Sequence, residues 1–294
     1  MTHKLWQPGA IIIAQPFLTP VTERATVSSM TRLAFLKLGG SLITDKTRPY
    51  TPRLDKLAEL ATQIAAATRL DPELRLVLGH GSGSFGHAAA SQHWPVNTGW
   101  TRADWRGFAE VWYQASALNR LVIEALHGAG IPAISFPPSA TSQANEGAII
   151  DWYLPPLQRA LEAGIMPLIQ GDVAFDVALN GVILSTEDLF FTLAQRLQPQ
   201  RILLAGLERG VWADFSARTR LVEAITPESF EVVAAGLTGA AGLDVTGGMR
   251  DKVKQMVRLV EKVPSLEVYI FSGEEAGNVQ RALLGEAVGS LIRR

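Results

Sequence analysis

Residues 33–41 read LAFLKLGGS, an apolar run that ends at two glycines and a serine. A mainly apolar run of this length, broken only by Lys37 and bounded by glycines, is typical of a strand buried on both faces of a parallel sheet. Residues 74–81 repeat the arrangement with LRLVLGHG, and residues 54–70 between them place apolar side chains at helical spacing. The sequence therefore predicts strand, glycine loop, helix, strand and second glycine loop, an order that implies right-handed crossovers and a parallel sheet.

The alternation of strands and helices continues along the chain. Further helices are predicted over 102–127, 154–163 and 186–197, and further strands over 131–136, 166–170 and 201–205. Residues 179–182, LNGV, predict a hairpin because Asn-Gly favours the tight turns that join antiparallel strands. The predicted fold class is α/β, with a mainly parallel central sheet covered by helices on both faces. Residues 1–31 show no sustained period, so we expect an N-terminal extension there and a single domain over 32–294.

Composition excludes several classes of protein. The 294 residues carry 27 Lys and Arg against 28 Asp and Glu, a net charge of −1, which argues against nucleic acid as a partner because such partners normally require a basic excess. The absence of cysteine excludes disulfides, thiolate catalysis and cysteine-ligated metal centres. No apolar run approaches the roughly 18–20 residues that span a membrane, and the apolar residues 10–14 end too soon for a signal peptide. We therefore expect a cytoplasmic protein without a membrane partner.

The first glycine loop combines flexible backbone with positive charge. Gly39 and Gly40 let the backbone approach a ligand closely and expose its N–H groups, and Ser41 follows them. Lys37 precedes the glycines and Lys46 follows nine residues later, so two cations lie within reach. This combination suits an anionic phosphate chain. The alternative interpretation is a plain Gly-Gly turn flanked by two solvated lysines.

The second glycine loop matches a dinucleotide-binding pattern, but its context disagrees. Gly81, Gly83 and Gly86 satisfy G-x-G-x-x-G. That fingerprint expects an acidic residue about 20 positions on, at the end of the next strand, whereas Asp104 at that distance falls in a predicted helix. A loop that gathers backbone N–H groups around a phosphate fits better, with His87 as a candidate donor to that phosphate. The alternative for His87 is a capping or packing role.

Further candidates lie at later strand ends. Because loops at the carboxyl ends of parallel strands share one edge of a sheet, the two glycine loops can each hold a phosphate, which indicates a donor and an acceptor. Asp172 follows Gly171 at a strand end and is a candidate to tether the lysines, or else a turn carboxylate. Gly248 opens a predicted helix with Lys252 one turn in, an arrangement that suits nucleotide phosphates. The usual P-loop and protein-kinase motifs are absent, yet phosphoryl transfer needs only positioning and charge neutralisation.

Seven motifs, taken in chain order, carry a resemblance to a known family. They are Lys37-Leu38-Gly39-Gly40-Ser41, Gly81 to His87, Gly171-Asp172, Ser185-Thr186-Glu187-Asp188, Gly210-Val211-Trp212-Ala213-Asp214, Thr246-Gly247-Gly248-Met249 with Lys252, and Val288-Gly289-Ser290-Leu291-Ile292. From about Leu33 onward the chain resembles the amino acid kinase family. Because His87 follows Gly83-Ser84-Phe85-Gly86 directly, the chain is most similar to the branch of this family that phosphorylates isopentenyl monophosphate.

This resemblance implies a fold and an activity. The fold is a three-layer α/β/α sandwich with a mainly parallel central sheet, in which residues of about 32–175 form an acceptor-binding lobe and about 176–294 an ATP-binding lobe. The activity is transfer of the γ-phosphoryl of ATP to isopentenyl monophosphate, an isoprenoid monophosphate. The resemblance further implies that Mg²⁺ arrives with the nucleotide rather than in a metal site of the protein, and that the partner is a second copy in a homodimer.

The resemblance also assigns roles to single residues. Lys37 and Lys46 would neutralise the transferring phosphoryl, and Asp172 would hold those lysines in place; with His87 they form the catalytic set. Residues on the ATP side would be Lys37, Gly39, Gly40, Ser41, Gly83, Asp214, Gly248 and Lys252. Residues that contact the acceptor would be Ser82, Gly83, His87 and Gly181.

The predicted helix over 102–127 supplies a candidate wall for the acceptor's carbon chain. Trp105, Phe108, Val111 and Trp112 share a broad apolar face, which suits a five-carbon alkenyl tail. Ordinary core packing is the alternative for each of them.

Two segments depart from the family pattern. Glu208-Arg209 stands where many members carry Val-Asp, so the residues that contact the adenine and the role of Asp214 stay open. Ser185-Thr186-Glu187-Asp188 replaces a commoner Ser-Gly-Asp-Asp type of run, and its alternative reading is a helix N-cap.

Two other functions stay open. A fosfomycin-type phosphonate kinase of the same family shares the glycine-loop histidine, whereas amino acid, carbamate and uridylate kinases fit less well. A non-catalytic nucleotide sensor is the alternative from a different class, although retention of Lys37, Lys46, Asp172 and Lys252 argues against it.

Overall fold

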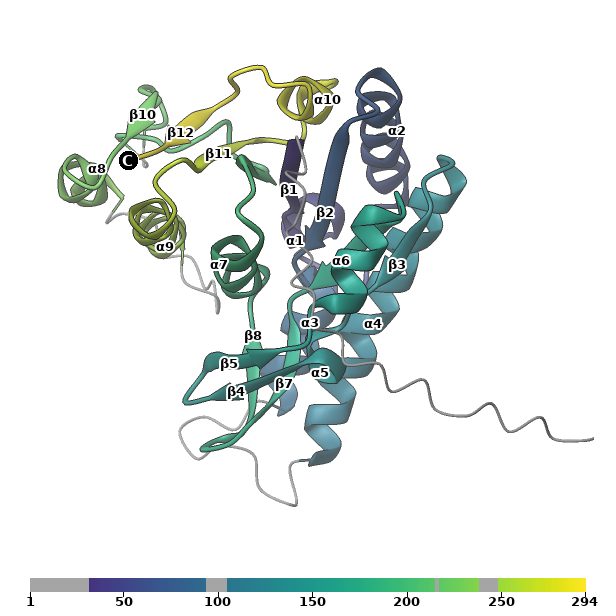
Figure 1. Ribbon diagram of the computed structural model, residues 1–294. Coiled ribbons are helices and arrows are strands. Elements are labelled where there is room, and N and C mark those ends of the chain that lie inside the picture. Colours follow the sequence, from purple (N-terminus) through teal and green to yellow (C-terminus); the bar gives the residue numbers. More distant parts are fainter. Residues whose placement is uncertain (1–31, 94–104, 215–216, 238–247) are drawn as a thin grey trace, which may run out of the picture. The chain divides into compact units, whose positions relative to one another are not determined.

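A central sheet of eight strands organises the part of the chain that the structure describes (Figure 1). In spatial order its strands are β10 (Ala224–Ile225), β12 (Ser290–Ile292), β11 (Glu267–Ser272), β9 (Arg201–Gly206), β1 (Arg32–Leu38), β2 (Leu74–His80), β6 (Met166–Gln170) and β3 (Ala133–Ser135). Neighbouring strands are parallel, except that β11 and β12 are antiparallel. The predicted mainly parallel sheet is confirmed.

The structure is a computed structural model, and it describes residues 32–93, 105–214, 217–237 and 248–294. The predicted extension over 1–31 lies outside these residues. The chain from Thr31 to Arg294 forms one compact unit. Its division into an acceptor lobe and an ATP lobe stays a prediction.

Helices cover both faces of the central sheet. On one face lie α2 (Leu54–Leu70), α4 (Trp105–Gly128) and α10 (Asn278–Leu283); on the other lie α6 (Pro155–Glu162), α7 (Thr186–Leu197) and α9 (Met249–Lys262). Alternate side chains of β1 point to opposite faces, as in any strand. Leu36 packs in the core shared with α2, α4 and α10, whereas the Phe35 ring lies 5.0 Å from the Phe190 ring of α7. Both strand side chains are fully buried, and the predicted three-layer sandwich is confirmed.

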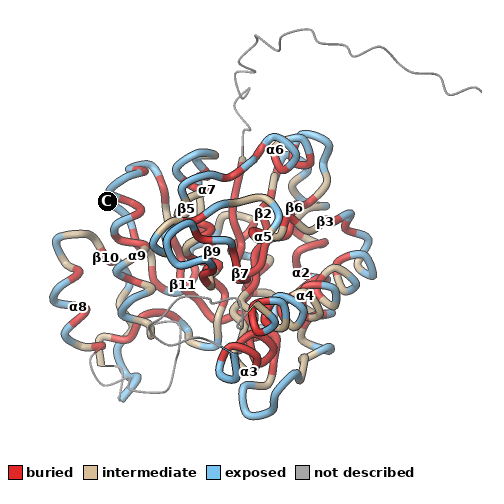
Figure 2. The backbone as a smooth tube through the Cα atoms, turned by 90° about the horizontal axis from the view of Figure 1, so that it is seen from below, coloured by how far each residue is buried: buried red, intermediate tan, exposed pale blue. Residues whose placement is uncertain are grey.

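Several predicted boundaries agree closely with the structure. The helices predicted over 54–70 and 186–197 are α2 and α7, with the same ends. The strand predicted over 131–136 is reduced to β3. The other helices of the described residues are α1 (Gly40–Ile43), α3 (Gly83–His93), α5 (Pro138–Thr141) and α8 (Phe230–Gly236). Buried residues are concentrated along the strands, and exposed residues lie mainly on the outer helices and loops (Figure 2).

A second sheet of four strands was only half predicted. Its order is β5 (Ala148–Trp152), β4 (Ser142–Asn145), β7 (Asp172–Asp176) and β8 (Asn180–Leu184). The predicted hairpin is β7 and β8, but its turn is residues 177–179 rather than Asn180-Gly181. Asn180 already pairs with Asp176, at a positive φ of 63°. The β4–β5 hairpin was missed, although its turn residues Glu146 and Gly147 have φ values of 52° and 80°, the left-handed pair that two-residue hairpins require.

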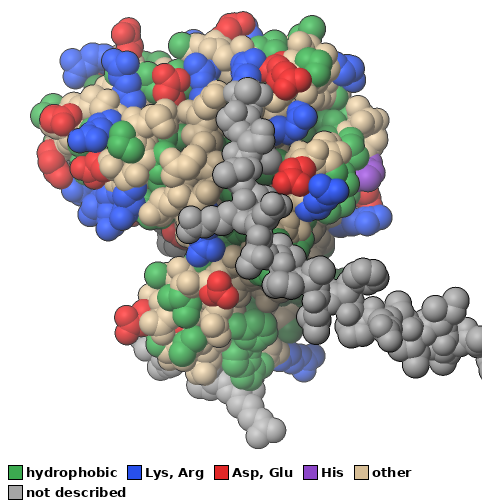
Figure 3. Space-filling view, viewed as in Figure 1, with side chains coloured by type: hydrophobic (Ala, Val, Ile, Leu, Met, Phe, Trp, Pro, Cys, Tyr) green, Lys and Arg blue, Asp and Glu red, His purple; other side chains and the backbone are tan. Residues whose placement is uncertain are grey.

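The surface is electrically mixed. On the face shown in Figure 3, Lys and Arg side chains are interspersed with Asp and Glu, in keeping with the net charge of −1. Hydrophobic side chains gather on the lower part of this face. Ile150 of β5, Phe175 of β7 and Val177 after β7 are each more than half exposed. In the part of the chain that the structure describes, no helix combines the length and apolar character needed to cross a membrane.

Candidate active site

A cavity of about 880 Å³ opens at the carboxyl ends of β1, β2, β6 and β9. The cavity is lined by both glycine loops, by Gly171-Asp172 and by the first turns of α7 and α9. The predicted site residues that it brings together are Lys37, Gly39, Gly40, Ser41, Lys46, Ser82, Gly83, His87, Asp172, Gly248 and Lys252. Parallel strands deliver their carboxyl ends to one edge, so residues far apart in sequence meet here.

Two predicted residues do not line this cavity. Gly181 is paired with Phe175 inside the β7–β8 hairpin. The Asp214 carboxylate instead holds a turn, because it accepts hydrogen bonds from the backbone N–H groups of Thr219 and Arg220. The Thr219 hydroxyl bond and these backbone bonds lower the pKa of Asp214. The structure therefore gives both residues local structural contacts rather than a place in the cavity.

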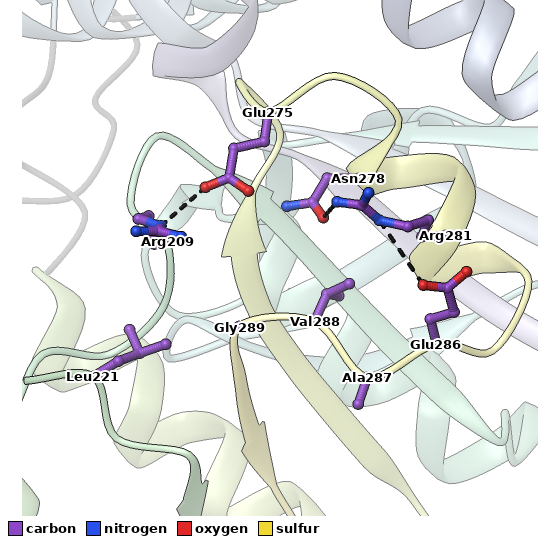
Figure 4. A pocket seen from close by; sticks show the side chains of 9 residues that line it. All are labelled: Arg209, Leu221, Glu275, Asn278, Arg281, Glu286, Ala287, Val288 and Gly289. Carbon is purple, nitrogen blue, oxygen red and sulfur yellow. Dashed lines mark hydrogen bonds and ion pairs between the residues drawn. The ribbon is translucent and has the colours of Figure 1, made fainter.

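A second cavity of about 320 Å³ lies beside α10 (Figure 4). Its polar side chains face one another: Arg209 Nε lies 3.0 Å from Glu275 Oε1, and Arg281 Nη2 donates to Asn278 Oδ1 over 2.8 Å. None of the predicted site residues lines it. The larger cavity is therefore the candidate active site.

The two glycine loops touch through their backbones. A Cβ atom added at Gly40 would lie 2.5 Å from the Gly83 nitrogen, and one added at Gly81 would lie 2.9 Å from the Gly40 nitrogen. Gly83 also has a positive φ of 52°, which side-chain-bearing residues rarely adopt. Glycine is therefore required where the loops meet, and two backbone segments rich in N–H groups face the same cavity.

Glu187 joins two lysines from distant parts of the chain. Lys37 Nζ, at the end of β1, donates to Glu187 Oε1 over 2.8 Å, and Lys252 Nζ of α9 lies 3.6 Å from the same oxygen. Burial alone would raise the pKa of Glu187, but the charges of Lys37 and Lys252 lower it to about 2. The carboxylate is therefore ionised and holds both ammonium groups at one point of the cavity.

Asp172 was predicted to hold Lys37 and Lys46, but the carboxylate that pairs with Lys37 in the structure is that of Glu187. The Asp172 carboxylate accepts hydrogen bonds from the Val173 backbone N–H at 2.8 Å and from the Gln170 side-chain amide at 3.3 Å. Burial raises the pKa of Asp172 to about 8, against the smaller lowering effect of these two bonds. At neutral pH this carboxyl is mainly protonated, so it is suited to donate a hydrogen bond rather than to anchor a cation.

A capping box fixes the turn that carries Glu187. Ser185 Oγ accepts from the Asp188 backbone N–H, and Asp188 Oδ2 accepts from the Ser185 backbone N–H. Gln255 of α9 donates to the other Asp188 oxygen over 2.7 Å, which ties α7 to α9. The predicted helix N-cap is therefore confirmed for Ser185 and Asp188, the first and last residues of the motif. Glu187 was missed because the run was treated as one unit, although an acid at this place in a matched motif was a usable signal.

A buried histidine supports the second glycine loop from behind. His80 is fully buried, and burial lowers its pKa to about 4, so the ring is neutral. Its Nδ1 lies 3.1 Å from the Gly81 carbonyl oxygen and its Nε2 lies 3.1 Å from the Asn119 side-chain nitrogen. These contacts assign the proton to Nδ1, which donates to Gly81 while Nε2 accepts from Asn119.

One end of the cavity has apolar walls. His87 of α3 lines it, followed by Ala90, Val111, Ala115 and Ile183. Of the four aromatic and aliphatic residues predicted to wall this region, Val111 alone lines the cavity.

The other three predicted wall residues lie elsewhere. Trp105 and Phe108 pack behind the wall, with the Phe108 ring 5.0 Å from the Phe175 ring. Trp112 is 43% exposed. Helical periodicity placed these side chains on one broad face, but of the four only Val111 reaches the cavity.

The opposite end is rich in charged side chains. Lys252, Lys254 and Arg258 of α9 line it together with Asp251, next to the helix N-terminus at Gly248. Glu208 also lines this end, and its carboxylate accepts from the Trp212 indole N–H at 2.8 Å and pairs with Arg218 at 2.9 Å. The departure from the family pattern at Glu208 therefore serves to tie together the segment after β9.

The fold and the site define a class of protein: an α/β phosphotransferase whose glycine loops and lysines gather at the carboxyl edge of a parallel sheet. The chain belongs to the amino acid kinase family, whose profile its residues 32–272 match.

Named relatives and a solved structure agree with this family. The chain is 31% identical to the isopentenyl phosphate kinase of Methanocaldococcus jannaschii, over 88% of this chain and 98% of the relative. It is 34% identical to the isopentenyl phosphate kinase of Methanothermobacter thermautotrophicus, over 87% and 97% respectively. An X-ray structure of isopentenyl phosphate kinase superposes with a TM-score of 0.74 at 31% identity, covering 89% of this chain and all of the other.

Proposed function

We propose that this protein transfers the γ-phosphoryl group of ATP to isopentenyl phosphate, forming isopentenyl diphosphate and ADP. The observation that carries the proposal is a single cavity in which two touching glycine loops and two lysines stand between an end rich in charged side chains and an apolar end. The names of the relatives support the same acceptor.

The residues of the cavity divide into two groups by their position. Lys252 and the N-terminus of α9 suit the phosphates of the nucleotide, because a helix N-terminus and an ammonium group both favour negative charge. His87 and Ser82 stand at the acceptor end and suit the phosphate of isopentenyl phosphate. Lys37 and Lys46 lie between the groups and would neutralise the charge on the transferring phosphoryl.

This division accounts for the chemistry without a strong general base. The acceptor oxygen belongs to a phosphate that is already ionised, so no proton must be removed before attack. The contribution of the protein is then to align the two phosphates and to stabilise the charge between them. The apolar strip of Ala90, Val111, Ala115 and Ile183 would hold the five-carbon tail.

Three further parts of the proposal concern the cofactor ion, the assembly and the location. We propose that Mg²⁺ enters bound to ATP, because Mg²⁺ in such sites is held largely by substrate phosphates and water. We propose a homodimer, since Ile150, Phe175 and Val177 are each more than half exposed, and exposed apolar side chains are used at protein interfaces when they lie together. A cytoplasmic location follows from the need for ATP.

The test is ADP release by the purified protein with Mg-ATP and a panel of acceptors. Isopentenyl phosphate and dimethylallyl phosphate should support turnover, and fosfomycin, glutamate and uridylate should not. Turnover with fosfomycin alone would replace the proposal by a phosphonate kinase. Nucleotide binding without turnover on any acceptor would favour a sensor and would reject the kinase.

A further inference from the structure

Thr44 lies between the two glycine loops, although it lines neither end of the cavity. It follows α1 directly and is 1% exposed. Its hydroxyl donates to the Gly40 carbonyl oxygen over 2.7 Å and accepts from the Ser84 backbone N–H over 2.9 Å. One side-chain oxygen therefore hydrogen-bonds to the first loop and to the start of the helix that closes the second.

The same side chain fills the space beside Gly83. A Cβ atom added at Gly83 would lie 2.3 Å from Thr44 Oγ1 and 2.7 Å from Thr44 Cγ2. The threonine thus occupies the volume that a side chain at Gly83 would need. The contact of Thr44 with Gly83 and its hydrogen bonds to Gly40 and Ser84 together define the distance between the two loops.

The contact extends to the segment that carries Lys46. Ser84 Oγ accepts from the Thr51 backbone N–H at 3.2 Å, and the Ser84 carbonyl oxygen accepts from the Tyr50 N–H at 3.5 Å. Residues 44–51 are therefore attached to the second loop at both ends, and Lys46 lies within this segment.

We propose that the Thr44 hydroxyl is a positioning group that sets the separation of the two phosphate loops, and with it the distance between donor and acceptor phosphates. This inference rests on the proposed function, since it concerns the alignment of two phosphates for transfer. Misplacing reacting groups by about 1 Å can cost about 100-fold in rate, so a group that spans the loops affects turnover more than the binding of either substrate.

Substitution by valine and by serine separates the hydroxyl from the shape. Thr44→Val keeps the branched shape but can neither donate nor accept, whereas Thr44→Ser keeps both hydrogen bonds. Thr62→Val is the matched control, because the Thr62 hydroxyl is exposed and donates only to Ala58 within its own helix. We expect kcat to fall at least tenfold in T44V with each KM changed less than threefold, and to stay within twofold of wild type in T44S and T62V.

Amide hydrogen exchange supplies a readout that does not depend on activity. T44V should lose protection over residues 82–86 and keep it over α2, whereas T44S should match the wild type. If T44V does not fold, Thr44→Ala removes the same hydroxyl without adding apolar volume and should give the same two results.

The outcomes separate this inference from the proposed function. A wild-type protein that phosphorylates none of the acceptors would reject the proposed function, while the exchange comparison would still decide whether Thr44 joins the loops. Wild-type kcat and wild-type protection in T44V would overturn the role of Thr44. An equal loss of kcat in T44S and T44V would also overturn it, because the hydroxyl would then not be the group responsible.

Discussion

Glu187 Oε1 lies 2.8 Å from Lys37 Nζ and 3.6 Å from Lys252 Nζ, so one carboxylate bridges a strand end and a helix that are far apart in sequence. The side chains of Lys37 and Glu187 are about one-tenth exposed, at 9% and 11%, so water screens the pair weakly. In a phosphotransferase this carboxylate keeps two cations together at the place where phosphate charge must be neutralised. Its negative charge also opposes the phosphates that approach them.

Glu187→Gln separates these two effects. The variant keeps the size of the side chain but removes the charge that orients Lys37 and Lys252, so we expect kcat to fall about 100-fold, of the order of the loss of one transition-state contact. The KM for ATP should fall or stay constant, because a negative charge has left the cavity. Removing one partner of a buried pair costs about 3–5 kcal/mol of folding free energy, which urea unfolding would measure.

A matched exposed pair provides the control for this substitution. Glu162 lies 3.0 Å from Arg159, and the side chains are 50% and 81% exposed. Glu162→Gln should leave kcat unchanged and alter stability by less than about 1 kcal/mol. If Glu187→Gln behaved like Glu162→Gln, the bridging carboxylate would have no role in ordering the lysines.

His87 and Lys46 should have separable effects on the reaction. His87→Ala removes a donor at the acceptor end, so kcat/KM for isopentenyl phosphate should fall by a factor that corresponds to about 2.7–4 kcal/mol, with the KM for ATP unchanged. Lys46→Ala should chiefly lower kcat, because the charge it neutralises develops during transfer. Steady-state kinetics with each substrate varied in turn distinguishes the two patterns. An unchanged acceptor kcat/KM in His87→Ala would remove this histidine from the site.

The meeting of the two glycine loops could be predicted from sequence because it follows from topology alone. Parallel strands that each end in glycines must deliver those glycines to one edge, whatever covers the sheet. The carboxylate partner of Lys37 could not be predicted in this way. It depends on where α7 lies above β1, which is set by tertiary contacts such as the Phe35–Phe190 ring pair.

The differences between prediction and structure at single residues have the same origin. Asp172 and Glu187 are both acids in matched motifs, and only the packing of two layers decides which faces the lysines. Gly181 was assigned to the acceptor from the family resemblance, whereas the structure pairs it with Phe175 inside the β7–β8 hairpin. Local pattern therefore identified the loops, and long-range packing decided the partners of their side chains.

The apolar end of the cavity should respond to a larger side chain on α4. Val111 is 2% exposed and lines the cavity, so Val111→Phe would fill part of the space proposed for the five-carbon tail. We expect the KM for isopentenyl phosphate to rise at least tenfold, with ADP binding unchanged by calorimetry. Trp112→Phe on the same helix is the control, because Trp112 is 43% exposed and lies outside the cavity lining. Equal effects of the two variants would place the tail elsewhere.

Asp172 predicts a pH dependence of stability that a single substitution can isolate. Burial raises the pKa of Asp172 from 3.8 to about 8 in the folded protein. Between pH 4 and pH 8 the folded protein therefore holds a proton that the unfolded chain has released, and the free energy of unfolding that Asp172 contributes decreases as pH rises. Asn resembles the protonated carboxyl in shape and carries no titrating proton.

The free energy of unfolding of Asp172→Asn, minus that of the wild type, should accordingly increase from pH 5 to pH 8 and level off above pH 8. Urea unfolding at pH 5, 6.5, 8 and 9 measures this difference. The contributions of His80, with its pKa lowered to about 4, and of Glu187, with its pKa lowered to about 2, occur in both proteins and cancel. Asp151→Asn, at an exposed aspartate of β5, is the control and should follow the wild type at each pH. A constant difference between Asp172→Asn and the wild type across this range would mean that the Asp172 carboxyl is ionised in the folded protein, and that it faces the phosphates as an anion rather than as a hydrogen-bond donor.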